Sequence, residues 1–98
     1  MADVVEKTEE FTRRYNKAAG SVVSAICRDG DLKQTDTATL LGVSPRQVRR
    51  MERGEASYTL AQLELIARAT RNATDEIVKS ITNWPSLQKS AGRRKISR

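Results

Sequence analysis

Residues 32–54 read LKQTDTATLLGVSPRQVRRMERG, and this stretch decides the fold. Its pattern predicts a short helix over residues 34–41 that ends at Gly42, because glycine readily adopts the left-handed conformation found at helix ends. Ser44 is a favourable N-cap, and Pro45 suits the first position of a helix, where its missing N–H is no loss. A second helix is therefore predicted to begin at Pro45.

This second helix, residues 45–52, is predicted to have one apolar and one basic face. Val48 and Met51 are three residues apart, so they share the side that we expect to face the core. The other side presents a basic stripe, either as a solvated helix face or as a binding surface. An exposed helix is about 10–12 Å across, which matches the roughly 12 Å width of the major groove of DNA. The stripe consists of Arg46, Arg49, Arg50 and Arg53.

The charge of the whole chain favours a binding surface. Its 98 residues include 18 lysine and arginine residues against 12 acidic residues, which gives a formal net charge of +6. Residues 85–98 carry basic residues and no acidic residue. Their low hydrophobicity predicts a disordered basic tail, which serves either as an electrostatic arm on DNA or as a solubilising segment. Basic charge concentrated in this way points to nucleic acid as the partner.

Apolar residues recur at helical spacing on the N-terminal side of the quoted stretch. They predict an amphipathic helix over residues 3–18 and further helix up to about residue 28. The Gly20–Ser21 pair between them either starts a new helix, with Ser21 as its cap, or kinks one long helix. Gly30 is expected to end this region in the left-handed conformation.

Two more helices are predicted on the C-terminal side. Thr59 is a favourable cap for a helix that begins at Leu60, and a last helix is expected from about Thr74. The Trp84–Pro85 pair ends it, because the residue before proline disfavours helix. No useful stretch alternates with period two, so the fold class is all-α. We expect an N-terminal helical extension at 1–17, a compact domain at 18–84 and the tail at 85–98.

The residues that the chain lacks exclude several classes of function. It has no histidine and one cysteine, Cys27, which removes histidine-dependent catalysis, the usual zinc sites and an intrachain disulfide. We therefore predict no enzyme activity and no cofactor, and we expect Cys27 to be a small apolar filler. No apolar run approaches the roughly 18 residues of a membrane span and no signal core is visible, so a cytoplasmic chain without a membrane partner is expected.

Together with YTLAQLELIARAT at residues 58–70 and DEIV at residues 75–78, the quoted stretch resembles the Cro/C1-type helix-turn-helix family, also called the XRE family. The resemblance covers about half of the chain directly. It implies a lambda-repressor-like domain of about five helices that binds double-stranded DNA. The matching landmarks are Leu32, Gln34, Ala38, Leu41, Gly42, Val43, Ser44, Val48, the run at 51–54 and residues 60–67.

The resemblance also implies roles for individual residues. Arginine reads guanine through two hydrogen bonds, to O6 and N7, and a helix N-terminus attracts phosphate because its free N–H groups point at the anion. The base-reading positions of the family fall on Pro45, Arg46, Gln47, Arg49 and Arg50. The expected phosphate contacts are Lys33, Gln34, Ser44, Arg53, Ser57, Tyr58 and Thr59.

Four departures from the family pattern carry expectations of their own. Lys33 replaces the usual serine or threonine cap before Gln34 and is expected to reach a phosphate instead. Pro45 stands where the family often has a polar base reader, so one direct hydrogen bond is expected to be absent. Thr37 replaces a commonly apolar residue, which predicts looser packing of the helix at residues 34–41. Residues 70–72, Thr-Arg-Asn, replace a common apolar–glycine–apolar turn, which leaves the start of the last helix open.

These features predict a transcription regulator, a small repressor or autoregulator that binds a palindromic operator as a homodimer. Two copies related by a two-fold axis read half-sites about 34–36 Å apart. The dimer contact is expected from the last helix, from Trp84 (otherwise a packing lid) or from the N-terminal extension. Phe11 and Tyr15 in that extension are expected to be core or interface residues.

The alternative function is that of an antitoxin or anti-activator, which uses the same fold to hold a partner protein. The N-terminal extension favours it, because Val4, Phe11 and Tyr15 offer apolar contacts there. RNA binding is less favoured, since single-stranded RNA readers display aromatic residues and only 4 % of this chain is aromatic.

Overall fold

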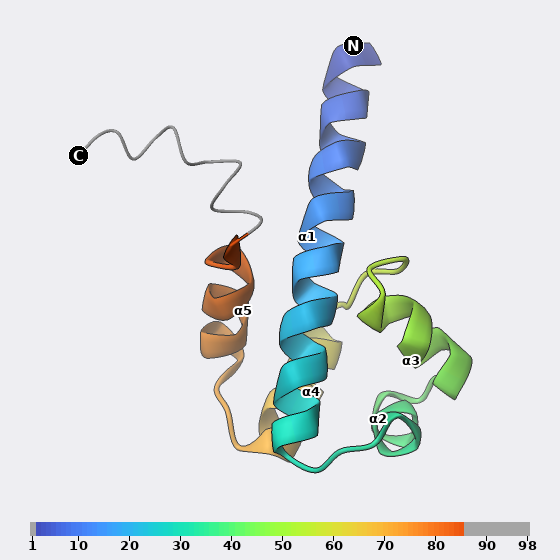
Figure 1. Ribbon diagram of the computed structural model, residues 1–98, viewed down its shortest axis with the longest axis vertical. Helices are drawn as coiled ribbons and strands as arrows, with labels where there is room; N and C mark the ends of the chain where they lie inside the picture. Colours follow the sequence, from blue (N-terminus) through green and yellow to red (C-terminus); the bar gives the residue numbers. More distant parts are fainter. Residues whose placement is uncertain (1, 86–98) are drawn as a thin grey trace, which may run out of the picture.

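Five helices make up the part of the chain that the computed structural model describes, which is residues 2–85, with side chains from residue 7 onward. No strand occurs in this part, so the predicted all-α fold class is confirmed. No helix within it is long and apolar enough to cross a membrane. The predicted tail lies, except for Pro85, outside the described residues. The helices, shown in Figure 1, are α1 (Ala2–Asp29), α2 (Gln34–Leu41), α3 (Pro45–Glu52), α4 (Leu60–Thr70) and α5 (Thr74–Thr82).

The α1 helix is continuous through Gly20 and Ser21, so Ser21 does not cap a new helix. Gly20 is buried where α1 meets the C-terminal end of α3. A Cβ atom at Gly20 would fall against the carbonyl oxygens of Glu52 and Met51, within 2.8 Å of the Met51 oxygen. The glycine therefore permits a close approach of two helices. The predicted boundary between residues 17 and 18 falls inside this helix.

The turn after α1 also differs from the expectation for Gly30. The left-handed conformation falls on Asp31, with φ of 61°, and Gly30 has no positive φ. Aspartate tolerates this conformation better than most residues, because its short side chain bonds locally to the backbone. The N–H of Leu32 then donates to the Cys27 carbonyl at 2.8 Å, which closes the end of α1.

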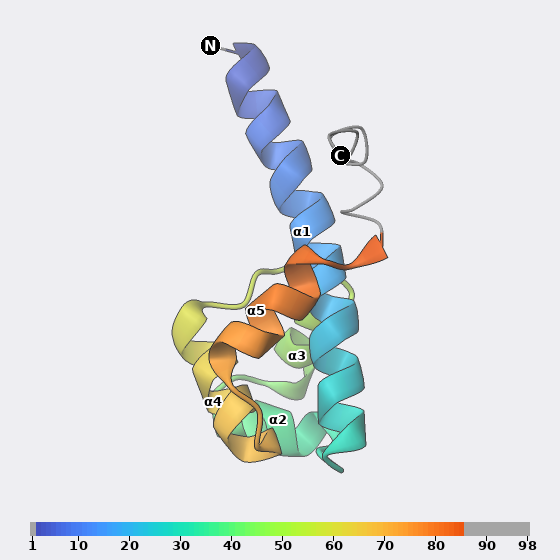
Figure 2. The ribbon, with the colours of Figure 1, turned by 90° about the vertical axis from the view of Figure 1, so that its left-hand side faces the viewer.

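The core lies where α1, α4 and α5 pack together, with α3 against the opposite side of α1 (Figures 1 and 2). Tyr15 and Trp84 are half-buried against this core, and the Tyr15 hydroxyl is 2.9 Å from Thr82 Oγ1 on α5. Phe11 remains 52 % exposed, so it is no part of the core. The buried apolar side chains include Val22, Val23, Leu63, Ile66, Ile77 and Ile81.

The packing around Thr37 on α2 is tighter than the sequence predicted. Thr37 is only 1 % exposed, so the expectation of looser packing around it is wrong. Its hydroxyl donates to the Lys33 carbonyl at 3.2 Å and lies 3.7 Å from Cys27 Sγ, so burial leaves it hydrogen-bonded. Cys27 is a buried filler, as predicted, and burial raises the pKa of its thiol.

The turn between α4 and α5 forms without the glycine that is common there. Arg71 adopts the left-handed conformation, with φ of 61°, and the N–H of Asn72 donates to the Ala67 carbonyl at 2.8 Å. These bonds close α4 in the usual way of helix C-termini. The last helix then begins at Thr74, which is the predicted residue.

The close approach at Gly20 makes a stability prediction. A Gly20→Ala substitution would gain about 0.5–1 kcal/mol from helix propensity if the site were open. Because the added methyl meets backbone atoms of α3, which cannot rotate away, we expect a net loss of about 1–3 kcal/mol. Urea unfolding followed by circular dichroism measures this loss. Ser21→Ala, at the exposed neighbouring position, is the control and should leave stability unchanged or slightly higher; equal stability of both variants would contradict the close contact.

Candidate nucleic-acid interface

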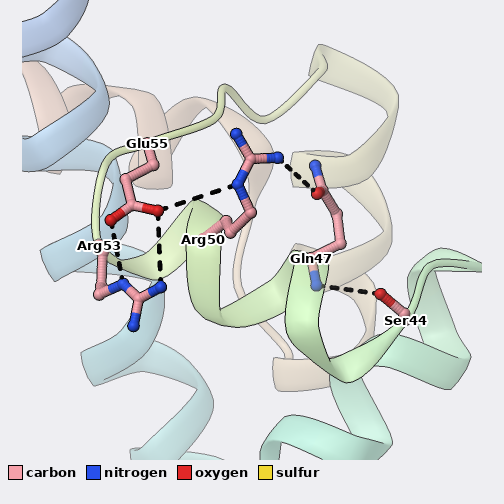
Figure 3. Close-up of polar contacts among 5 residues, drawn as sticks. All are labelled: Ser44, Gln47, Arg50, Arg53 and Glu55. Atoms are coloured by element: carbon pink, nitrogen blue, oxygen red, sulfur yellow. Dashed lines mark hydrogen bonds and ion pairs between the residues drawn. The ribbon is translucent and has the colours of Figure 1, made fainter.

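The turn between α2 and α3 is set by two residues of the quoted stretch. Gly42 ends α2 in the left-handed conformation with φ of 70°, and a Cβ atom there would meet nothing within 4 Å. Glycine is therefore favoured at this position by backbone conformation and not by space. Ser44 then caps α3, because its Oγ accepts the N–H of Gln47 at 3.1 Å (Figure 3). Pro45 follows at the first helical position, as predicted.

The inner face of α3 is fixed against the body of the domain. Val48 and Met51 are 1 % and 0 % exposed, which confirms the predicted inner face. Two residues after the end of α3, Gly54 has φ of +81°, and a Cβ atom on it would fall 2.8 Å from Lys17 Cα on α1. The C-terminal end of α3 thus meets α1 at two glycines, Gly20 and Gly54. This double contact sets the direction in which the outer face of α3 points.

The outer face carries the predicted base-reading residues. Pro45, Arg46, Arg49 and Arg50 are exposed, and Gln47 is partly exposed. The Gln47 side-chain oxygen accepts a hydrogen bond from Arg50 Nη1 at 3.0 Å (Figure 3). Arg46 and Arg49 form no salt bridge among the described residues. The structure therefore brings the five residues together on one solvent-facing surface.

Glu55 is a residue of this surface that the sequence analysis missed. Its carboxylate accepts from Arg53 Nε at 3.2 Å and lies 3.8 Å from Arg50 Nε (Figure 3). The three side chains are 45–62 % exposed. Exposed ion pairs of this kind contribute only about 0–1 kcal/mol each. The arginines can therefore exchange this carboxylate for a phosphate oxygen at little cost.

The predicted phosphate contacts at the start of α2 lie beside α3. Gln34 is exposed, and its Nε2 donates to Glu52 Oε1 at 2.8 Å, which ties the N-terminus of α2 to the last residue of α3. Lys33 occupies the N-cap position, where its backbone N–H donates to Asp36 Oδ2 at 3.0 Å. Its side chain is exposed and makes no capping bond. Both residues flank the outer face of α3 at one end.

The loop after α3 supplies the other predicted contacts. Ser57 is exposed, and its Oγ donates to Asn16 Oδ1 on α1 at 3.0 Å. Thr59 caps α4, because its Oγ1 accepts the N–H of Gln62 at 3.0 Å while its own N–H donates to the Gln62 side chain at 2.9 Å. The loop is thus held both to α1 and to the start of α4.

Tyr58 is the exception among the predicted phosphate contacts. Its ring packs against the core, and its hydroxyl oxygen is buried without a hydrogen-bond partner among the described residues. Burial raises the pKa of this phenol, and the nearby Glu52 carboxylate raises it further, so the hydroxyl stays neutral. A hydroxyl turned inward cannot reach a phosphate at the surface, and we leave it out of the interface.

The chemistry of this surface is that of binding. Within residues 7–85 no three His, Cys, Asp or Glu side chains converge as metal ligands would. What the surface offers is four guanidinium groups, the amide side chains of Gln34 and Gln47, the ammonium group of Lys33 and the N-termini of α2, α3 and α4. These groups donate hydrogen bonds to phosphate oxygens and to the edges of bases.

Comparison with known proteins agrees with this architecture. The sequence profile of the HTH_3 helix-turn-helix family matches residues 24–77, which span the end of α1 to the start of α5. No curated protein matches the chain significantly.

Solved structures share the fold. The clp gene regulator ClgR from Corynebacterium glutamicum has a TM-score of 0.67 at 18 % identity, over 86 % of this chain and 87 % of that one. An HTH_3 family transcriptional regulator from Vibrio cholerae has a TM-score of 0.58 at 26 % identity, over 81 % of this chain and 43 % of that one. The chain therefore belongs to the HTH_3 family of Cro/C1-type (XRE) helix-turn-helix proteins.

Proposed function

We propose that this protein is a DNA-binding transcription regulator that inserts the outer face of α3 into the major groove. The observation that carries the proposal is the division of α3 between buried Val48 and Met51 and an exposed basic face. The chain matches the helix-turn-helix family, and in helix-turn-helix proteins the second helix of the motif, here α3, lies in the major groove. Its solved relatives, described as a gene regulator and a transcriptional regulator, agree with it.

Within this surface we assign two roles. The outer face at Pro45, Arg46, Gln47, Arg49 and Arg50 reads base edges. Arg46 and Arg50 are four residues apart, so their side chains lie one above the other along the groove. The bond from Arg50 to Gln47 holds the guanidinium toward the N-terminal part of α3.

The phosphate contacts surround this face. Arg53 and the exposed groups of Lys33, Gln34, Ser44, Ser57 and Thr59 lie at its two ends, on α2, on the cap of α3 and on the following loop. Contacts to the backbone at both ends position the reading helix without carrying sequence information.

We further propose that the protein acts in the cytoplasm as a homodimer on a palindromic operator and represses transcription there, including that of its own gene. One copy of α3 covers only a few base pairs, so a second copy on the adjacent turn of DNA is what gives an operator useful length. The alternative is an antitoxin or anti-activator that holds a partner protein, and the exposed Phe11 on α1 is the observation that favours it. Both functions use the same domain.

Selection of bound sequences from random duplex DNA tests the proposal directly. The full chain should enrich a two-fold symmetric consensus with half-site centres one helical turn apart, since each half-site faces one α3. Retention of random DNA without any enrichment would contradict sequence-specific regulation. An asymmetric consensus bound by one copy would contradict the homodimer alone.

Substitutions in the basic face separate base reading from phosphate contact. Replacing Arg46 or Arg50 by alanine should cost about 1–3 kcal/mol per half-site on the selected duplex and relax the preference at one base pair. Arg53→Ala should weaken the selected and random duplexes alike and lower the salt slope by about one unit per site. Binding to single-base variants at fixed salt measures the first effect, and a salt titration measures the second.

The matched control is Arg68→Ala on α4, which lies outside the proposed interface. The Arg68 guanidinium pairs with the Glu64 carboxylate at 2.8 Å. It should leave both affinity and base preference unchanged. A uniform loss of affinity for every sequence in the Arg46 and Arg50 variants would show that α3 does not read bases.

A further inference from the structure

The first half of α1 projects beyond the domain (Figures 1 and 2). Every side chain from Lys7 to Arg13 is exposed, and Tyr15, which bonds to Thr82, is half-buried against the core. Phe11 is the aromatic residue of the projecting segment, with its ring 5.6 Å from that of Tyr15. The projecting segment therefore presents a half-exposed aromatic side chain, Phe11 at 52 %, on a helix surface that no other described element covers.

The charges of this segment are segregated along its length. Residues 2–10 carry four acidic residues and one basic residue, whereas residues 11–17 carry three basic residues and no acidic residue. A copy of the segment that runs in the opposite direction therefore brings the acidic half of each helix against the basic half of the other. A parallel copy in register brings like charges together.

Helical periodicity sharpens this complementarity. Two exposed residues of opposite charge, Lys7 and Glu10, are three residues apart and lie along one flank of Phe11 on the helix surface. In an antiparallel pair centred between residues 8 and 9, Lys7 of each copy meets Glu10 of the other copy.

We propose that residues 2–15 of α1 pair in antiparallel fashion with the same segment of a second copy, with Phe11 within one helical turn of the centre of the interface. The contact is self-complementary, as a two-fold dimer requires. This inference deepens the proposed function, on whose homodimer it rests, by naming the dimer surface. At a rise of 1.5 Å per residue, this antiparallel pairing separates the two Gly20 residues by at least about 34 Å. That distance leaves room for the two α3 helices on successive turns of DNA.

Charge reversal tests the pairing without DNA, by sedimentation of the full chain at micromolar concentrations. The unmodified chain should be a dimer. Lys7→Glu and Glu10→Lys should each raise the dimer dissociation constant about three- to tenfold, because each places like charges together at two symmetric sites. The double variant K7E/E10K should restore the dimer. So should an equimolar mixture of the two single variants, as a heterodimer of one more acidic and one more basic chain.

The mixture keeps the test independent of helix propensity, since the helices of the single variants are unchanged when they are mixed. Failure of both the double variant and the mixture to recover the dimer would overturn the antiparallel pairing. An unmodified chain that stays monomeric at all micromolar concentrations would overturn the proposal as a whole. Residues 86–98 or another protein would then be the candidates to cover the α1 surface around Phe11.

An apolar substitution locates the centre of the interface. Phe11→Ala should weaken the dimer at least about tenfold, as truncation of a central aromatic residue commonly does. Leu65→Ala, at an exposed apolar position on α4, is the matched control and should leave the dimer dissociation constant unchanged. The opposite pattern would place the interface on α4 and contradict the proposal.

DNA binding of the same samples keeps the two proposals apart. A dimer with the expected charge dependence that enriches no DNA sequence would overturn the proposed function and support this interface. A monomer that binds a selected duplex specifically would do the reverse.

Discussion

The contact between α1 and the C-terminal end of α3 is the constraint on which the rest of the structure depends. Two glycines from different segments meet the opposing backbone there, Gly20 on α1 and Gly54 after α3. Gly20 meets the backbone of Met51 and Glu52, and Gly54 meets Lys17 at its N, Cα and Cγ atoms. Such close contacts tolerate little sliding or rotation of the two segments past each other. The direction of α3 is therefore set by the long helix, and the exposed face of α3 is a rigid surface.

Around this rigid helix, the polar groups are arranged so that they can change partners. Arg50 and Arg53 share the Glu55 carboxylate, and Gln34 is held by Glu52, all at or near the surface. Such bonds orient the side chains but stabilise the free protein little. A phosphate offers the same arginines a stronger acceptor, since guanidinium–phosphate bonds are frequently bidentate. In the proposed function, a phosphate takes the place of the Glu55 carboxylate beside Arg50 and Arg53.

The local elements of the domain could be predicted because their signals are local. The Ser44 cap, Pro45 at the first helical position and the inward Val48–Met51 pair follow from residue chemistry and helical spacing, and the structure has them where the sequence predicts. The continuity of α1 could not be predicted in this way. The Gly20–Ser21 pair has the composition of a helix break, and only the approach of α3 shows why glycine is needed inside the helix.

The remaining differences have the same origin. Nothing in the order of residues decides whether Gly30 or Asp31 takes the left-handed position after α1, because the choice depends on how Leu32 enters the core. Likewise, Tyr58 stands in a polar loop, and only the fold reveals that its hydroxyl turns inward. The ion pairs of Glu55 with Arg50 and Arg53 had one indication in the sequence, which is that an acidic residue stands two positions after Arg53. Glu55 is not among the positions to which the family resemblance assigns a role.

The central claim is that the outer face of α3, held by α1, is the DNA-binding surface. Its most direct test is an amide NMR titration of the full chain with the duplex recovered by selection. We expect the largest shifts on residues 45–53 and on the flanking positions at Gln34 and Ser57, with small changes along α5. Shifts concentrated on α5 or on residues 7–13 of α1, with α3 unaffected, would contradict it.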